Sequence, residues 1–188
     1  HFASLWTGGG AEIGFFDLGA EEARDAALSA TGDFLAVGTA GGCWIWDVPQ
    51  RRRLVCLPGV HVFKVEFGTA PAPPDFKNSM PVLKTIARDG ARLWRVGRWE
   101  QPLGILGIED DPLVVGAWSS KGDWVVVAGQ SGALAVGRSN QRELVRGGTV
   151  SHSAVVRALR INPAGDAYVS AADDSRVRLW KVPAGGEP

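Results

Sequence analysis

The sequence predicts an all-β protein built from short antiparallel strands that recur along the chain. In residues 154–182, AVVRALRINPAGDAYVSAADDSRVRLWKV, apolar residues recur at nearly every second position and are interrupted by turn residues at regular intervals. Such alternation between clusters of Gly, Pro, Asn and Asp is typical of half-buried strands joined by tight turns. Related patterns occur earlier in the chain, and repetition at this spacing indicates a repeat architecture.

The last repeat shows the elements most clearly. A first strand precedes the turn Asn162–Gly165, a second leads to the turn Asp173–Arg176, and a third ends on Trp180-Lys181. The apolar positions of the three strands are Val156, Leu159 and Ile161, then Tyr168 and Val169, then Val177, Leu179 and Trp180. We therefore expect an antiparallel meander of three strands.

Weaker copies of this pattern precede it. Residues 26–48 end on Trp46-Asp47, and residues 62–96 end on Trp94-Arg95. Residues 115–137 repeat the turns but place Val136 or Gly137 at the tryptophan position. Residues 5–18 read as the second half of a repeat that closes on Phe16-Asp17.

These segments resemble WD40 repeats, the four-stranded blades of a β-propeller. The resemblance divides the chain into a half blade (1–22), three blades (23–60, 61–110 and 111–150), an incomplete blade (151–183) and a tail (184–188). Roughly four and a half blades are fewer than the seven usual in WD40 proteins, and unpaired blades leave apolar faces open. We therefore expect part of a larger propeller, completed by a missing segment or by a second chain.

The resemblance also gives a role to His152, Ser170, Asp174 and Trp180. In the family, residues at these positions form a buried hydrogen-bond relay from Asp to His, from His to Ser, and from Ser to the indole N–H. The same residue types could suggest a catalytic triad, which needs a serine beside a histidine oriented by a carboxylate. We interpret them as a structural relay and expect no catalytic residues. A second, weaker candidate set is His61, Thr85, Asp89 and Trp94.

Two segments are candidate partner-binding surfaces. Arg51, Arg52 and Arg53 form the densest positive charge, expected in the hairpin before the outermost strand of a blade. They are either a solvated turn or a site for an acidic partner or a phosphate. Residues 69–81, TAPAPPDFKNSMP, contain four prolines and predict a surface loop. Phe76 and Met80 have no obvious core to enter from that loop, so with Lys77 they are candidates for contact with another protein.

Composition excludes several classes of protein. Lys plus Arg and Asp plus Glu both number 20, so no net field attracts nucleic acid or an anionic membrane. No apolar run reaches the roughly 18 residues of a membrane span. Only Cys43 and Cys56 occur, without metal-ligand spacing, which favours an intracellular protein with no metal or other cofactor.

We therefore expect a non-catalytic scaffold that mediates protein–protein interaction as a subunit or domain of an intracellular complex. The alternative is a regulatory or sensory propeller attached to a signalling module, such as a kinase or a nucleotide-dependent switch. An enzyme built on a propeller would need acids, bases and histidines that converge from several blades, and only His61 and His152 lie inside repeats. Direct nucleic-acid binding is not expected either, because no aromatic platform is interleaved with basic residues.

Overall fold

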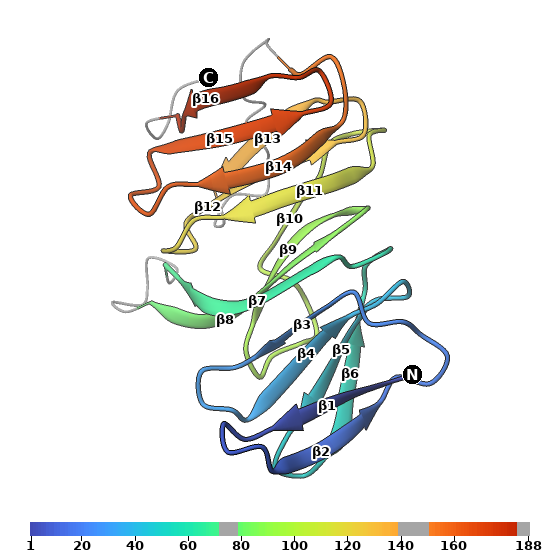
Figure 1. The fold of residues 1–188 in the computed structure, drawn as a ribbon. Coiled ribbons are helices and arrows are strands. Elements are labelled where there is room, and N and C mark those ends of the chain that lie inside the picture. Colours follow the sequence, from blue (N-terminus) through green and yellow to red (C-terminus); the bar gives the residue numbers. More distant parts are fainter. Residues whose placement is uncertain (72–78, 139–150, 184–188) are drawn as a thin grey trace.

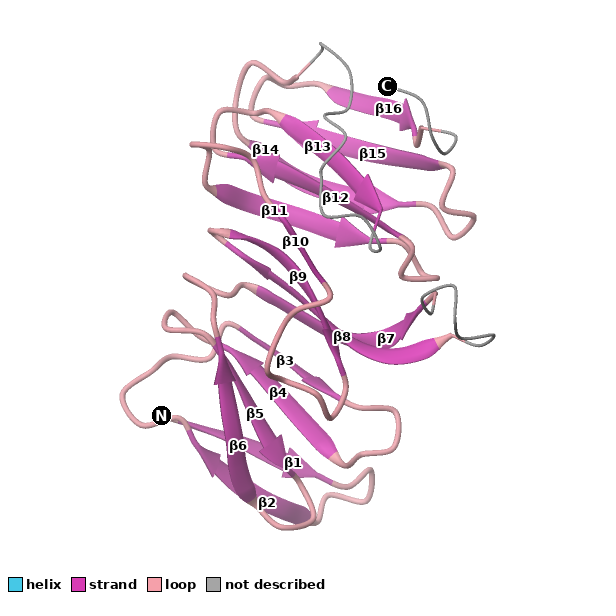
Figure 2. Ribbon diagram, turned by 180° about the vertical axis from the view of Figure 1, so that it is seen from behind, coloured by secondary structure: helices cyan, strands magenta, loops and turns pink. Residues whose placement is uncertain are grey.

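The computed structural model describes residues 1–71, 79–138 and 151–183, and every regular element in these ranges is a strand (Figure 2). In this part of the chain, no helix exists that is long and apolar enough to cross a membrane. The strands form five antiparallel sheets that follow one another in chain order (Figure 1). The N-terminal and C-terminal sheets lie at opposite ends of this stack (Figure 1).

Each sheet is made of strands that are consecutive in the sequence. The first sheet is β1 (Phe2–Trp6) and β2 (Glu12–Asp17), and the second is β3 (Asp25–Leu28), β4 (Phe34–Gly38), β5 (Cys43–Asp47) and β6 (Arg52–Leu57). The third is β7 (Lys64–Ala70), β8 (Met80–Ala87), β9 (Gly90–Arg95) and β10 (Gly104–Leu106). The fourth is β11 (Leu113–Trp118), β12 (Trp124–Gly129) and β13 (Leu134–Arg138), and the fifth is β14 (Val156–Ile161), β15 (Ala167–Ala172) and β16 (Val177–Lys181). Each range predicted for a blade contains the strands of one sheet, and the predicted all-β fold is confirmed.

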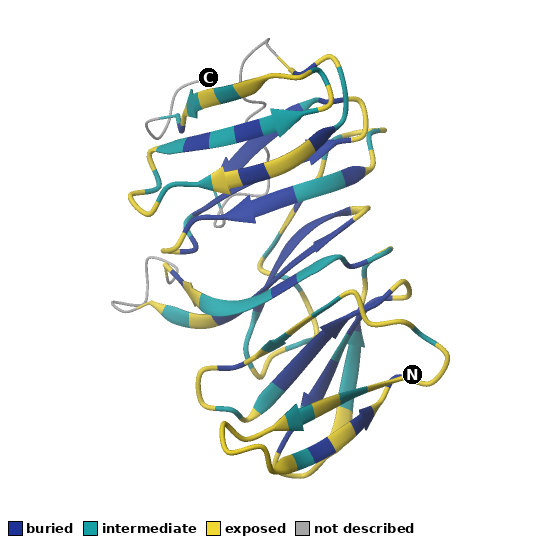
Figure 3. Ribbon diagram, in the orientation of Figure 1, coloured by how far each residue is buried: buried dark blue, intermediate teal, exposed yellow. Residues whose placement is uncertain are grey.

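The sheets stack through two different faces. We call the face that carries Trp46, Trp94 or Trp180 the tryptophan face, and the opposite one, with Ile45, Leu93, Val136 or Leu179, the aliphatic face. Neighbouring residues of a strand point to opposite faces, so a tryptophan and the residue just before it in the strand lie on different faces of the sheet. Trp94 packs in one cluster with Ile45 of the preceding sheet, and Val136 packs in another with residues of the following sheet. The aliphatic face of one sheet therefore covers the tryptophan face of the next, which buries the core between them (Figure 3).

The first sheet differs from its prediction. Phe16 was expected at the tryptophan position, but it faces the following sheet and makes an edge-to-face contact with Trp46 at 6.1 Å. Phe15 points to the opposite, open side. A shift of one residue exchanges the two faces of a strand. Two adjacent phenylalanines hide that shift from a reading of the sequence, so placing Phe16-Asp17 in the Trp-Asp slot was wrong.

The proline-rich loop is shorter than predicted. Thr69 and Ala70 end β7, and Met80 and Pro81 begin β8, so both edges of the predicted 69–81 loop are paired strand. Pro81 lacks an N–H, but its carbonyl oxygen still accepts a hydrogen bond from Val96 N at 3.2 Å. A proline at the start of a strand costs only one ladder bond, which explains why the strand reaches it.

Candidate functional site

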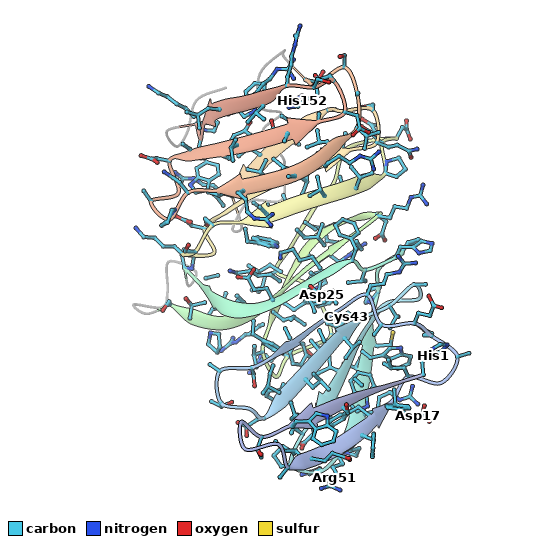
Figure 4. All side chains as sticks on the ribbon, in the orientation of Figure 1. His1, Asp17, Asp25, Cys43, Arg51 and His152 are labelled. Atoms are coloured by element: carbon cyan, nitrogen blue, oxygen red, sulfur yellow. The ribbon has the colours of Figure 1, made fainter. Side chains whose placement is uncertain are left out.

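The structure brings His152, Ser170, Asp174 and Trp180 together in the fifth sheet. His152 precedes β14, Ser170 lies on β15, Asp174 is in the β15–β16 turn, and Trp180 is on β16. His152 Nδ1 lies 3.0 Å from both Asp174 carboxylate oxygens, and His152 Nε2 lies 2.7 Å from Ser170 Oγ. Trp180 Nε1 donates to the same Ser170 oxygen at 2.8 Å. Figure 4 labels His152 at the end of this sheet.

The relay has one consistent direction. The indole N–H donates to Ser170 Oγ, the Ser170 hydroxyl donates to Nε2, and the Nδ1–H of His152 donates to Asp174. Burial alone raises the pKa of Asp174, but hydrogen bonds from Arg178, His152 and two backbone N–H groups outweigh it. The net effect is a pKa well below the ordinary value of an aspartate. Asp174 therefore stays a carboxylate and can hold the imidazole and the Ser153 N–H at once.

This geometry does not suit nucleophilic catalysis. Ser170 is fully buried and His152 is only 2% exposed, so an acyl substrate has no approach to the hydroxyl oxygen. That oxygen already accepts the indole N–H and sits inside the sheet. A catalytic serine needs its oxygen free and an oxyanion-binding site beside it. The arrangement can fix the entry into β14 to the β15–β16 turn, and that is the role we assign to it.

The second candidate set assembles only in part. Trp94 Nε1 donates to Thr85 Oγ1 at 3.1 Å, which reproduces the indole–hydroxyl half of the relay in the third sheet. Asp89 binds Arg92 through both oxygens and accepts a hydrogen bond from Val60 N at 3.0 Å. No hydrogen bond among the described residues joins the His61 ring to this set. Arg92 therefore pairs with the turn carboxylate in place of a histidine.

Two further carboxylates also link a connection between sheets to a turn, and the sequence analysis did not predict them. Asp111 accepts hydrogen bonds from both the backbone N–H and the hydroxyl of Ser131, which ties the entry of β11 to the β12–β13 turn. Glu21 accepts from Thr39 Oγ1 and from Gly41 N in the second sheet. The available signal was an acidic residue in each connection or turn, but its position shifts from one repeat to the next.

The arginine run is divided among three environments. Arg51 lies in the β5–β6 turn, and Arg52 and Arg53 begin β6, so the run lies in the predicted hairpin and extends into its outermost strand. Arg51 Nη2 donates to the carbonyl oxygen of Ile13 at 2.6 Å and ties this turn to the first sheet, at the end of the molecule labelled in Figure 4. The Arg53 guanidinium lies over the Trp44 ring, 4.4 Å from its centre. Of these three arginines, only Arg52 has an exposed side chain with no hydrogen-bond or ring partner among the described residues.

The residues predicted on the proline-rich loop are only partly placed. Met80 is half-buried and packs against the cluster between the third and fourth sheets, so the expectation that it lacks a core was wrong. Phe76 and Lys77 lie outside the described residues. Their contact with a partner stays a prediction.

A groove opens between the third and fourth sheets, at the end of the sheets where the carboxylates bind the connections. Its volume is about 370 Å³, and its lining includes Val60, Arg88, Ile108, Asp110, Pro112 and Leu113. Leu113 is buried at its base, while Val60 is 52% exposed at its edge. The charged side chains of Arg88 and Asp110 are exposed beside this apolar lining. The groove combines an apolar interior with one positive and one negative side chain at its edge. No pattern in the sequence predicted it.

The cysteines and acidic side chains do not suggest a metal site. Among the described residues, no cluster of three or more His, Cys, Asp or Glu could hold a metal ion. Cys43 and Cys56 are free thiols on neighbouring strands. Burial raises the pKa of both, which keeps them protonated and unreactive.

The comparisons with known proteins agree with this architecture. Residues 116–187 match the family model of the anaphase-promoting complex subunit 4 WD40 domain. No curated protein is similar enough to count as a relative. The match covers the last two sheets, and together with the stack of antiparallel sheets it supports a β-propeller fold of the WD40 type.

Solved structures share the fold at low sequence identity. A chain of the mitotic checkpoint complex is 18% identical with a TM-score of 0.67, over 96% of this chain and 54% of that one. The Swd1 (Cps50) β-propeller domain of Myceliophteria thermophila is 15% identical with a TM-score of 0.67, over 96% and 58%. The computationally designed Ika8 protein is 23% identical with a TM-score of 0.74, over 95% and 52%. The chain thus spans about half the length of these three solved chains.

Proposed function

We propose that this chain is a non-catalytic scaffold and that it binds a partner protein in the groove between the third and fourth sheets. The observation that carries the proposal is the groove itself: residues from three separate connections converge there, two of the connections supply its apolar lining, and Arg88 and Asp110 are exposed at its edge. Its volume of about 370 Å³ can hold one or two side chains of a peptide, and the charges can fix their orientation.

The connections around the groove are held firmly enough to present one shape. Asp89 accepts from Val60 N, Arg88 N donates to the Val60 carbonyl oxygen at 2.8 Å, and Leu113 N donates to the Arg88 carbonyl oxygen at 2.8 Å. A surface already ordered before binding loses less conformational entropy when a partner docks. The solved propellers support the same use, since one of them is part of the mitotic checkpoint complex. The free thiols of Cys43 and Cys56 support an intracellular setting.

Site-specific photo-crosslinking in the native cell tests the proposal. A photoreactive side chain replaces Val60 in one version of the full-length protein and Leu28 in the other. Leu28 is a matched control, because it is 42% exposed and borders a second apolar groove of about 380 Å³ between the second and third sheets. We expect one recurrent protein to be cross-linked from position 60 and not from position 28. Equal products from both positions, or none from position 60, would contradict the proposal.

A further inference from the structure

The groove between the third and fourth sheets lies inside the stack. The second sheet packs on the other face of the third sheet, and the fifth sheet packs on the other face of the fourth (Figure 1). The connections that line the groove therefore have a described sheet on both sides. Their charged side chains indicate which kind of protein segment fits the groove.

The lining contains more acidic than basic side chains. Three carboxylates, those of Asp89, Asp110 and Asp111, line the groove together with one guanidinium, that of Arg88. The charge of Asp89 is already neutralised, because Arg92 donates to its two oxygens at 2.8 and 3.0 Å. The rest of the lining carries two negative charges against one positive charge.

The two remaining carboxylates belong to one connection. Asp110 has an exposed side chain with no hydrogen bond or ion pair to any described residue. Asp111 accepts hydrogen bonds only from the backbone N–H and the hydroxyl of Ser131, so no cation in the described part of the chain offsets its charge. In the sequence, these carboxylates lie between Ile108 and Pro112, which supply part of the apolar lining. Negative charge is thus concentrated beside the apolar interior.

The connection that carries these carboxylates is held in one conformation. Asp111 N donates to the carbonyl oxygen of Ile108 at 3.3 Å, and Gln130 N donates to the carbonyl oxygen of Pro112 at 2.9 Å. Asp110 has a φ of 55°, in the left-handed region that Asp and Asn adopt more readily than most residues. A charge that is positioned before binding loses less conformational entropy when a partner docks.

We infer that the groove binds a protein segment in which an aliphatic side chain lies next to a lysine or arginine. This assignment rests on the binding function proposed for the groove. The aliphatic side chain fills the apolar interior, and the cation pairs with the carboxylates of Asp110 and Asp111. Opposite charges across an interface favour the correct partner and fix its register. Arg88 repels a cation on its own side and so opposes the reversed orientation of the segment.

Photo-crosslinking from position 60 of the full-length protein in the native cell tests the chemistry of the partner, once the cross-linked segment is sequenced by mass spectrometry. We expect a lysine or arginine within two positions of the cross-linked residue. A neutral or acidic segment would overturn this partner class and leave the binding function standing. The absence of any cross-linked protein would overturn both.

A synthetic peptide that copies the cross-linked segment measures the contribution of the charges. Asp110→Asn removes one negative charge, keeps a residue type that tolerates positive φ, and should weaken peptide binding about threefold or more. Arg88→Gln is the matched control, because it removes one charge from another exposed side chain of the lining. It should leave binding unchanged or strengthen it.

A double-mutant cycle then identifies the partner of Asp110. Replacing the basic residue of the peptide with glutamine should weaken binding to the wild type and have little further effect on binding to Asp110→Asn, because the two groups form one pair. Equal weakening by Asp110→Asn and Arg88→Gln, or additive losses in the cycle, would overturn the inference.

Discussion

Replacing Ser170 with alanine should destabilise the fold by about 2–3 kcal/mol. The Ser170 oxygen links His152 Nε2 at 2.7 Å to Trp180 Nε1 at 2.8 Å, and it is fully buried. The substitution leaves the buried imidazole nitrogen without a partner, which costs about 1–3 kcal/mol. The indole N–H of the half-buried Trp180 can turn partly to water, so its loss adds less. The total is a large share of the roughly 5–15 kcal/mol that stabilises a typical domain.

Urea unfolding followed by tryptophan fluorescence measures this difference. Ser153→Ala is the matched control, because Ser153 is exposed and its hydroxyl has no hydrogen-bond partner among the described residues. A surface change of this kind should stay within about 0.5 kcal/mol of wild type. The same unfolding midpoint for Ser170→Ala and Ser153→Ala would refute the reasoning, because the relay would then contribute nothing to stability.

Three further changes have expected outcomes. The pKa of Asp174 is held low in the folded state despite burial, so wild type should lose stability as the pH falls below the ordinary aspartate value, where only the unfolded chain gains a proton. The free energy of unfolding of Asp174→Asn, measured with urea, should therefore change less than that of wild type between pH 5 and 3. Parallel changes in the two proteins would argue against this. Gly132→Ala should lower the free energy of unfolding, measured by thermal melts, by several kcal/mol more than Gly10→Ala. Both glycines have positive φ, but a Cβ at position 132 would lie 2.5 Å from a backbone oxygen, whereas position 10 is open. Equal losses of stability would be inconsistent with the packing. Burial raises the pKa of both thiols, and Cys43 is more completely buried than Cys56. A thiol reagent at pH 8 should therefore label Cys56 slowly and Cys43 only after unfolding. Rapid labelling of Cys43 in the native protein would contradict its burial.

The sequence was sufficient for the repeat and for the relay of the last blade. Alternation with period two and turns at fixed intervals leave few architectures open, and the tryptophan positions mark one of the two faces of each sheet. The contact between Ser170 and Trp180 followed from the resemblance to WD40 repeats and not from strand register, in which Ser170 pairs with Arg178 and Trp180 with Tyr168. The less regular repeats were harder, since Phe15 and Phe16 are both apolar and only the packing of the second sheet selects one of them.

The groove and the carboxylate contacts could not be predicted for a different reason. They depend on connections that come from separate repeats and meet only in three dimensions. Asp89 binds Val60 across 29 positions, and Asp111 binds Ser131 across 20, with no fixed place in the repeat. Side-chain contacts of this kind follow the local path of each loop, which varies in length and composition.

Quantitative co-purification tests the central claim most directly. The full-length protein, a Val60→Glu variant and a Leu28→Glu variant are each isolated from the native cell, and the proteins that elute with them are measured by mass spectrometry. If the chain is a scaffold that uses the groove between its third and fourth sheets, a near-stoichiometric partner should accompany the wild type and Leu28→Glu and fall at least tenfold with Val60→Glu. Retention of the same partner by all three proteins, or no stoichiometric partner with the wild type, would contradict the account.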